Sequence, residues 1–352
     1  MKAWVLHGIG DIRMEERELP VISEGEALVR VAACGICGSD IPRIYTTGAH
    51  VHPIIPGHEF AGTVEKVYSD KDSMWINKRV SVFPLIPCRE CKPCLKKKYE
   101  MCKNYNYLGS RCDGGFAEYV KVPVANLIEL PDTTSLEVGA MMEPMAVAVH
   151  SIRQIGIDNN GYALVSGFGT IGYFVVMMLL GMGQEKVIVI GKGKAQKDRF
   201  DELCTSYINE SGFNIIFIDC IEGDNIKEKL SEYEVTSAYE CVGTNKSLEN
   251  CINSLGPSGK MVTVGNPHSD MALEKNVYWK ILRSQLEIHG TWNSSFTGEN
   301  DDDWHYIIKL LKDEKIQPEK IITHRMRVSE LENGFFIMRD KLESYGKVMM
   351  KI

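Results

Sequence analysis

The amino-acid sequence predicts an α/β protein in which a β-rich amino-terminal region precedes a doubly wound parallel sheet. Two observations lead to this prediction. Up to residue 146, short apolar runs alternate with glycine and proline turns, a pattern typical of strands joined by tight connections. From about residue 160, apolar strands alternate with helical segments, which implies crossover connections and a parallel sheet. The length of 352 residues fits two domains.

The expected elements follow in order along the chain. The clearest strands of the first region are 27–31 and 79–83. In the second region a helix at 171–180 follows the first of the strands, which we expect at 162–166, 186–190, 214–218, 236–239 and 261–264. After residue 285 the pattern is mixed again, with a helix at 303–312 and a last strand at 347–352.

The composition excludes several classes of protein. Hydrophobic residues make up 44% and charged residues 25%, so the chain is not disordered. Forty basic residues stand against 47 acidic ones without a long basic run, which argues against binding to nucleic acid or to an anionic membrane. The uncharged stretch 159–184 is interrupted by glycines, and the amino terminus is not a secretory signal. We therefore expect a soluble, cytoplasmic protein.

Four closely spaced cysteines predict a structural zinc site. Cys88, Cys91, Cys94 and Cys102 can surround one tetrahedral ion, and four thiolates leave no position for water. An iron–sulfur cluster is the chemical alternative, and a chance cluster of free thiols is the structural one. The chain has eleven cysteines. Because we expect a cytoplasmic protein, the scattered ones are expected to be reduced and buried rather than paired in disulfides.

A second zinc site, open to substrate, is predicted from separated loops. Cys37 and the pair His58-Glu59 offer a thiol, an imidazole and a carboxylate, the donors of catalytic zinc sites. Each residue alone is more often structural, and spacing does not reveal the third ligand. His50 and His52 flank Val51 before a proline, which is typical of loop surface rather than of a metal pair.

A glycine fingerprint predicts dinucleotide binding. Gly167, Gly169 and Gly172, with Thr170 and Ile171 between them, follow an apolar strand and open a helix, the context in which this motif holds a pyrophosphate. A glycine-rich structural turn is the alternative.

The strand that follows the fingerprint lacks the acidic residue that usually stands at its end. About twenty residues further on, where an acidic residue usually binds the ribose hydroxyls, the chain has Gly191-Lys192-Gly193-Lys194. This favours NADP over NAD as the cofactor, with NAD still possible. Lysines on a surface turn are the alternative explanation.

These motifs in this order resemble the zinc-containing medium-chain alcohol and polyol dehydrogenases. The stretches that carry the resemblance are 35–44, 48–50, 57–60, 88–102, 109–119, 143–147, 290–292 and 323–325. The resemblance implies a GroES-like β-barrel catalytic domain at 1–146, with a zinc lobe at about 86–104. A Rossmann cofactor domain at 147–285 and a carboxyl-terminal return at 286–352 would follow.

The resemblance also implies roles for single residues. Glu143 would be the missing ligand of the catalytic zinc, with Glu59 an alternating or outer carboxylate, and Ser39 would pass the substrate hydroxyl proton toward solvent. Arg43 and His50 would reach a phosphate or distal hydroxyls, and Trp292 would supply an apolar wall. An arginine paired with a carboxylate is the alternative for Arg43. Pro42 replaces the relay histidine of many relatives, so the proton exit beyond Ser39 is unassigned.

The expected function is hydride transfer between a nicotinamide cofactor and a sugar-alcohol phosphate with its keto-sugar phosphate. A free-polyol dehydrogenase of the sorbitol type and a reductase of another ketose phosphate are alternatives within the class. A non-catalytic dinucleotide-binding relative is the alternative outside it. We further expect a homodimer or homotetramer that acts on a small-molecule substrate.

Overall fold

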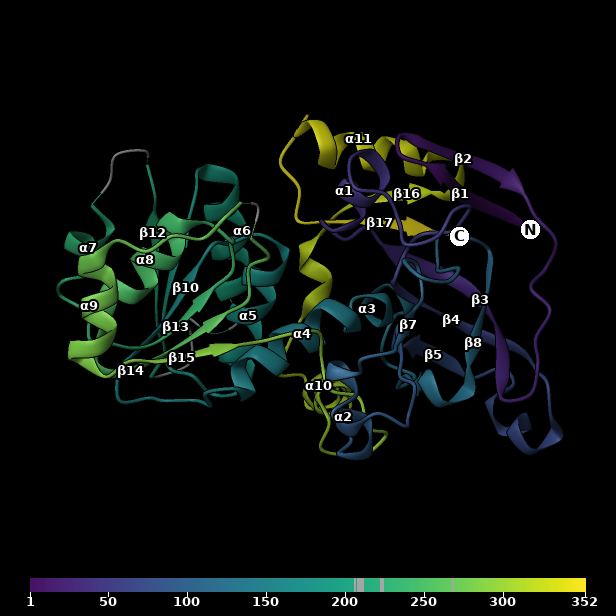
Figure 1. Ribbon diagram of the computed structural model, residues 1–352, viewed down its shortest axis with the longest axis horizontal. Coiled ribbons are helices and arrows are strands. Elements are labelled where there is room, and N and C mark those ends of the chain that lie inside the picture. Colours follow the sequence, from purple (N-terminus) through teal and green to yellow (C-terminus); the bar gives the residue numbers. More distant parts are fainter. Residues whose placement is uncertain (206, 208–211, 222–224, 268) are drawn as a thin grey trace. The chain divides into compact units, whose positions relative to one another are not determined.

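The computed structural model describes residues 1–205, 207, 212–221, 225–267 and 269–352, which divide into two compact units (Figure 1). The first unit comprises Met1–Glu143, Ser295–Asp313 and Ile322–Ile352. The second comprises Pro144–Ser294 and Glu314–Ile321. The chain thus returns to the first unit after completing most of the second.

The first unit is built around a seven-stranded, mainly antiparallel sheet. Six strands follow the order β16-β17-β3-β4-β5-β9, and β8 pairs with β3. Their bounds are β3 (Glu26–Gly35), β4 (Glu59–Val67), β5 (Arg79–Val82), β8 (Tyr119–Pro123), β9 (Leu127–Glu129), β16 (Ile322–Arg327) and β17 (Lys347–Lys351). The predicted strands 27–31 and 79–83 lie on β3 and β5, and the predicted last strand is β17. This is the GroES-like domain of the prediction.

Smaller elements complete the first unit. β1 (Lys2–Gly8) pairs with β2 (Asp11–Glu16), and β6 (Leu85–Ile86) pairs with β7 (Asn106–Tyr107). The helices are α1 (Asp40–Tyr45), α2 (Lys92–Leu95), α3 (Leu136–Ala140), α10 (Asp303–Lys312) and α11 (Leu331–Asp340). Short 3₁₀ helices lie at Asp70–Trp75, Tyr99–Met101, Val124–Asn126 and Val328–Glu330. Phe335 of α11 packs against Phe116 and Trp4, with ring centroids 5.6 and 6.1 Å apart. The carboxyl-terminal segment therefore contributes both sheet and core.

The second unit contains the doubly wound sheet. Its six strands are all parallel, in the order β12-β11-β10-β13-β14-β15, which is the 3-2-1-4-5-6 order of a Rossmann fold. The strands are β10 (Tyr162–Ser166), β11 (Lys186–Gly191), β12 (Asn214–Asp219), β13 (Val235–Glu240), β14 (Leu255–Thr263) and β15 (Glu287–Gly290). The helices are α4 (Met142–Arg153, which begins in the first unit), α5 (Thr170–Gly181), α6 (Lys194–Cys204), α7 (Ile226–Lys229), α8 (Asn245–Ser254) and α9 (Lys275–Ser284), with a 3₁₀ helix at Pro318–Ile321.

Two sequence expectations meet the structure here. The predicted boundary at 286 is too early, because β15 pairs with β14 and is the sixth strand of the Rossmann sheet. The strand is only four residues long and only one of them, Ile288, is a large apolar residue, so its sequence does not stand out. The uncharged stretch 159–184 consists of β10 and α5, separated by the glycine loop. Within the described part of the chain, no helix is long and apolar enough to cross a membrane.

Candidate metal and cofactor sites

The four predicted cysteines form one cluster in the first unit. Their sulfur atoms all lie within 4.8 Å of one another. Cys91 and Cys94 are 3.5 Å apart, as are Cys88 and Cys102, while two further pairs are 3.9 Å apart. Four sulfurs at about 2.3 Å from a tetrahedral zinc would be about 3.8 Å apart, so this donor set fits the ion. α2 begins immediately after Cys91 and returns Cys94 to it within one turn.

The cluster is also prepared electrostatically for a cation. Backbone amides of Lys103 and Cys94 donate to the Cys91 sulfur and lower the pKa of that thiol to about 6. Burial raises the pKa of the Cys94 thiol. Zinc is bound by cysteines as thiolates, and the amide hydrogen bonds to Cys91 favour that form.

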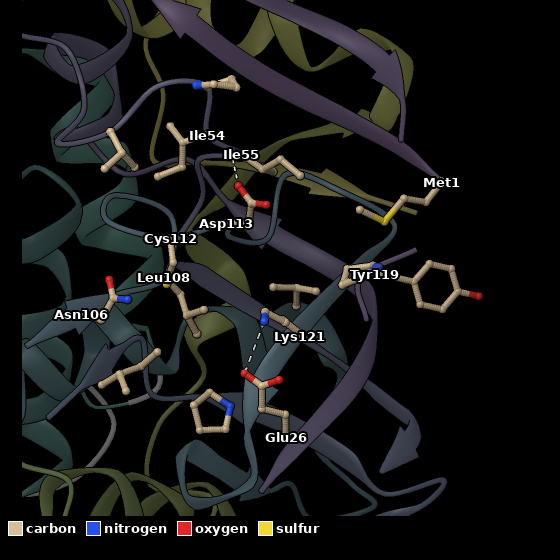
Figure 2. Close-up of a pocket in the computed structure, with 16 residues that line it drawn as sticks. Met1, Glu26, Ile54, Ile55, Asn106, Leu108, Cys112, Asp113, Tyr119 and Lys121 are labelled. Atoms are coloured by element: carbon tan, nitrogen blue, oxygen red, sulfur yellow. Dashed lines mark hydrogen bonds and ion pairs between the residues drawn. The ribbon is translucent and has the colours of Figure 1, made fainter. Parts of the chain in front are cut away.

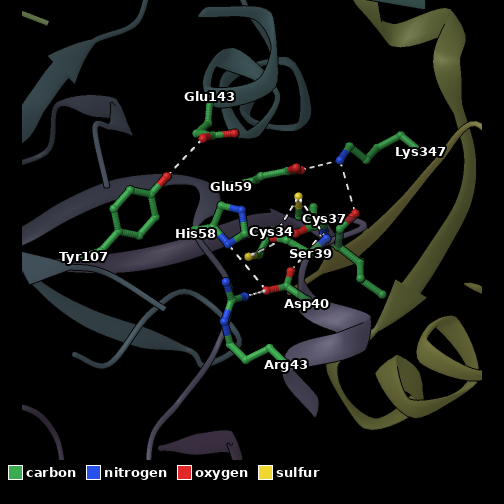
Figure 3. Close-up of polar contacts among 12 residues, drawn as sticks. Cys34, Cys37, Ser39, Asp40, Arg43, His58, Glu59, Tyr107, Glu143 and Lys347 are labelled. Carbon is green, nitrogen blue, oxygen red and sulfur yellow. Dashed lines mark hydrogen bonds and ion pairs between the residues drawn. The ribbon is translucent and has the colours of Figure 1, made fainter. Parts of the chain in front are cut away.

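The second predicted group comes together where β3 ends and β4 begins (Figure 3). Gly35 and Glu59 are opposite each other in the antiparallel pair, so the residues that follow Gly35 meet those that precede Glu59. One donor atom each from Cys37, His58 and Glu59 lies within 4.8 Å of the others. His58 and Glu59 are buried, with exposed fractions of 5% and 1%, and Cys37 is half-buried.

A buried aspartate that the sequence analysis missed organises this group. Asp40 is fully buried at the start of α1, and its Oδ1 lies 3.4 Å from Nδ1 of His58. The same oxygen accepts a hydrogen bond from Arg43 at 2.5 Å, and Oδ2 accepts one from the Cys37 amide at 3.0 Å. Burial alone would raise the pKa of Asp40, but these partners, His58 first, lower it. The contact with Nδ1 leaves Nε2 of His58 as the nitrogen for a metal.

Ser39 and Arg43 flank the same loop. The exposed Ser39 donates from Oγ to the Cys37 sulfur at 3.3 Å. The Arg43 side chain is 18% exposed and forms its ion pair with Asp40, which is the arrangement of the alternative explanation for this arginine. Its role toward substrate stays a prediction.

Glu143 stands apart from the three-residue donor group. It is 9% exposed and accepts a hydrogen bond from the Tyr107 hydroxyl at 3.1 Å. Burial raises the pKa of its carboxyl group to about 7, and the nearby Glu59 adds to the effect. The donor group that lies within 4.8 Å contains Glu59 and not Glu143, so the expected ligand role of Glu143 stays a prediction. Tyr107 gave no signal in the sequence, because only the β6–β7 pairing brings it here.

Lys347 is a further residue that the sequence analysis missed. It begins β17, is 1% exposed, and its ammonium group contacts Oε2 of Glu59 (Figure 3). The available signal was a single lysine at the start of an apolar strand, Lys347–Lys351. A buried lysine requires a partner, and here that partner is a predicted site residue.

The other two expected substrate residues are exposed. His50 lies on a loop, where burial and the charges of Arg111 and Arg43 lower its pKa. Trp292 is 59% exposed and belongs to the second unit. Their roles stay predictions.

The glycine fingerprint has the conformation that its sequence predicted. Gly167 follows β10 with φ +97°, a region that favours glycine, and a Cβ on Gly172 would overlap the Gly167 carbonyl oxygen. Gly169 precedes α5, whose first two residues are Thr170 and Ile171. A helix that starts in this way after a glycine turn is the usual place for a pyrophosphate in dinucleotide-binding folds.

The turn after β11 has a structural reason for its glycine. A Cβ on Gly191 would overlap the ring of Phe217 on β12. The carboxylate of Asp219, at the end of β12, accepts a hydrogen bond from the Gly193 amide at 2.8 Å. Lys194 pairs with Asp198 at 2.7 Å, whereas Lys192 is exposed and has no ion pair among the described residues.

A cavity of about 400 Å³ lies elsewhere in the first unit (Figure 2). Asn106 and Leu108 line it, on either side of Tyr107 in the sequence. Its charged groups are already satisfied, since Lys121 pairs with Glu26 at 3.5 Å and Asp113 accepts a hydrogen bond from the Ile55 amide. It holds no metal-ligating group of the two sites above.

Known protein families match segments of both units. The family model of the alcohol dehydrogenase GroES-like domain matches residues 23–132, and that of zinc-binding dehydrogenases matches residues 170–313. Galactitol 1-phosphate 5-dehydrogenase of Escherichia coli K12 is 32% identical over 92% of both chains. The crystal structure of the Escherichia coli enzyme superposes with a TM-score of 0.88 over 100% of both chains.

Two other proteins extend the comparison. Sorbitol dehydrogenase of Bacillus subtilis is 29% identical and covers 84% of this chain and 83% of its own. A structure from Escherichia coli CFT073, described as a short chain alcohol dehydrogenase complexed with the cofactor NADH, is 25% identical. Its TM-score is 0.88, over 100% of this chain and 99% of its own. From these matches and the two donor groups, the chain belongs to the zinc-dependent medium-chain alcohol and polyol dehydrogenases.

Proposed function

We propose that this enzyme transfers a hydride between a nicotinamide cofactor and a sugar-alcohol phosphate, interconverting it with the keto-sugar phosphate. The observation that carries the reaction type is the group of half-buried Cys37 and buried His58 and Glu59, which offers the donor set of an open zinc site. The phosphorylated substrate is supported by the 32% identity to galactitol 1-phosphate 5-dehydrogenase.

Each residue of the group has a part in this chemistry. Cys37, His58 and Glu143 would hold the zinc ion, with Glu59 as an alternating or outer carboxylate, and the ion would supply a Lewis acid that favours loss of the substrate hydroxyl proton. Asp40 lies 3.4 Å from Nδ1 of His58 and would orient its ring. Ser39 is exposed beside the Cys37 sulfur, so its hydroxyl can receive the substrate proton and pass it to solvent. Cys88, Cys91, Cys94 and Cys102 would hold the structural ion.

For the cofactor we propose NADP(H), with NAD(H) as the weaker alternative. Gly167, Gly169, Thr170, Ile171 and Gly172 would hold the pyrophosphate. Lys192 and Lys194, after Gly191, would lie near the 2′-phosphate of the adenosine ribose. The NADH-bound relative supports use of a nicotinamide cofactor.

A kinetic panel of free and phosphorylated C5 and C6 polyols tests the substrate proposal. We expect Arg43→Ala to raise KM much more for phosphorylated than for free polyols, because arginine binds phosphate through its two-pronged guanidinium group. Loss of the Arg43–Asp40 ion pair would affect the reaction of both substrate classes alike. The ratio of KM for phosphorylated polyols to KM for free polyols therefore isolates the contact with phosphate. An unchanged ratio would show that Arg43 is structural.

A free-polyol dehydrogenase is the second candidate. It is favoured by the pairing of Arg43 with Asp40 and by the similarity to sorbitol dehydrogenase. Higher kcat/KM for free sorbitol than for every phosphorylated polyol would decide for it. A non-catalytic protein would be indicated by one bound zinc per chain instead of two.

We further propose that the protein is at least a homodimer through strand β15. This edge strand of the Rossmann sheet buries none of its four residues in the single chain, and Ile288 is 43% exposed. Antiparallel pairing of two copies about Ile288 would place Glu287 opposite His289, a pair that can form a hydrogen bond, and would cover both edges. Sedimentation of wild type and of Ile288→Lys tests this, since only an interface at β15 makes the variant a monomer.

A further inference from the structure

Lys347 is a buried cation beside a proposed metal site. Its ammonium group contacts Oε2 of Glu59 and donates a second hydrogen bond to the Ile36 carbonyl oxygen at 3.2 Å. Lys347 and Glu59 are each 1% exposed. A lysine and a glutamate without solvent must compensate each other, because either charge alone would be costly to bury.

The sheet order brings this pair to the metal donors. β17, β3 and β4 are neighbours, with Met349 opposite Gly35 and Gly35 opposite Glu59. Lys347 therefore reaches the site from one side of β3, and Glu59 from the other. A Cβ on Gly35 would overlap the Glu59 carboxylate, so the glycine leaves the space in which this carboxylate meets the lysine.

Other charged groups of the site also act on the Lys347–Glu59 pair. Burial lowers the pKa of Lys347, but Glu59, Cys37 and Glu143 together outweigh burial and raise it, so the lysine is a cation. The partner of the Glu143 carboxylate is a neutral donor, the Tyr107 hydroxyl, whereas the partner of the Glu59 carboxylate is the cation Lys347. The two carboxylates are thus held by different means.

We propose that Lys347 is a positioning residue, which holds the Glu59 carboxylate to one side of the Cys37–His58 donor pair and keeps a metal position open for substrate. This inference rests on the proposed function, in which a zinc ion is held by Cys37 and His58. Without Lys347, the zinc would be the nearest cation for Glu59. The carboxylate would then bind the ion, hold it more tightly and occupy the substrate position.

Zinc release to a chromogenic chelator tests this without any substrate. Cys37→Ala identifies the release phase of the proposed catalytic ion, because that phase is lost in this variant. We expect Lys347→Met to slow the phase about tenfold, because the freed Glu59 carboxylate would add a ligand to the ion; this is the reverse of the loss of metal affinity that is usual when an outer partner of a ligand is replaced. In the double variant Lys347→Met/Glu59→Gln the rate should return to the wild-type range, and Lys347→Arg should behave as wild type.

Lys351→Met is the matched control. Lys351 is on the same strand and pairs with Glu137 at 3.4 Å, but its side chain is 60% exposed. This variant should leave the release rate unchanged. The visible spectrum of the Co²⁺-substituted protein gives a second readout, which should change in Lys347→Met and not in Lys351→Met.

Wild-type release from folded Lys347→Met, with an unchanged Co²⁺ spectrum, would overturn the proposal. If that variant does not fold, Lys347→Gln keeps a hydrogen-bond donor without the charge, and the same two outcomes decide. A failed substrate assignment would leave all these readouts intact. Absence of a Cys37-dependent phase in the wild type would instead overturn the metal site together with this inference.

Discussion

The turn that follows β11 allows the cofactor preference to be worked out in some detail. Lys192 is exposed there, without an ion pair among the described residues, while the charge of Lys194 is offset by Asp198. The carboxylate of Asp219 is bound to the amide of Gly193 in the same turn. One uncompensated cation and one anion therefore lie beside the position that we propose for the ribose 2′-phosphate.

These charges set the size of the expected preference. A charge-assisted hydrogen bond to phosphate contributes about 1.5–3 kcal/mol, which corresponds to about ten- to hundredfold. Asp219 repels the same phosphate, and both side chains are solvated, so the lower end applies. We expect kcat/KM to be about tenfold higher for NADP⁺ than for NAD⁺.

Two isosteric or truncating changes test the contributions separately. Lys192→Ala should lower kcat/KM for NADP⁺ about tenfold and leave that for NAD⁺ unchanged. Asp219→Asn keeps an oxygen for the Gly193 amide but removes the charge, so kcat/KM for NADP⁺ should rise. Lys186→Ala, at the opposite end of β11, is the control.

The obvious substitution of Gly191 by aspartate is a poor test, because its Cβ would overlap Phe217. Steady-state kinetics with both cofactors at matched substrate and ionic strength give the decisive numbers. A wild-type kcat/KM for NAD⁺ that equals or exceeds the NADP⁺ value would refute the reasoning.

Three other outcomes are expected. Cys94→Ser should remove one zinc per chain and lower Tm by several degrees. Cys220→Ser, outside the cluster, is the control and should keep both ions. Equal zinc contents in the two variants would contradict the structural site. Cys37→Ala should abolish turnover in a protein that stays folded and keeps one zinc, and substantial residual kcat would remove Cys37 from the reaction. Glu137, which accepts hydrogen bonds from Arg325 and pairs with Lys351, has a lowered pKa, because these cations outweigh the effect of burial. Its stabilising contribution is present above pH 4.5 and is lost as the pH falls below that value. Glu137→Gln should therefore cost about 0.5–1 kcal/mol at pH 7, and the difference in unfolding free energy from wild type should shrink in acid; a constant difference would point to packing instead.

The sequence alone was sufficient wherever the relevant contacts are local. The spacing of the four cysteines within 15 residues predicts one ion site, because a chain this short can only fold them around a common centre. The alternation of apolar strands and helices predicts the parallel sheet, and Gly167 to Gly172 predicts the helix start, since turn conformation and close packing depend on neighbours in the chain. Strands 162–166 and 186–190 are found at these positions.

Tertiary structure alone decided what surrounds each predicted residue. Tyr107 and Lys347 come from distant segments, and only the pairing of β6 with β7 and of β17 with β3 brings them to the site. Asp40 is close to Cys37 in the chain, but it meets His58 only because β3 pairs with β4. No local pattern encodes such pairing, because each strand is equally apolar whichever neighbour it takes. The same holds for Gly191, whose lack of a side chain the sequence assigns to cofactor choice, while the ring of Phe217 on the next strand gives it a packing reason. Local spacing thus determined the kinds of site, and contacts between distant strands determined how their charges are balanced.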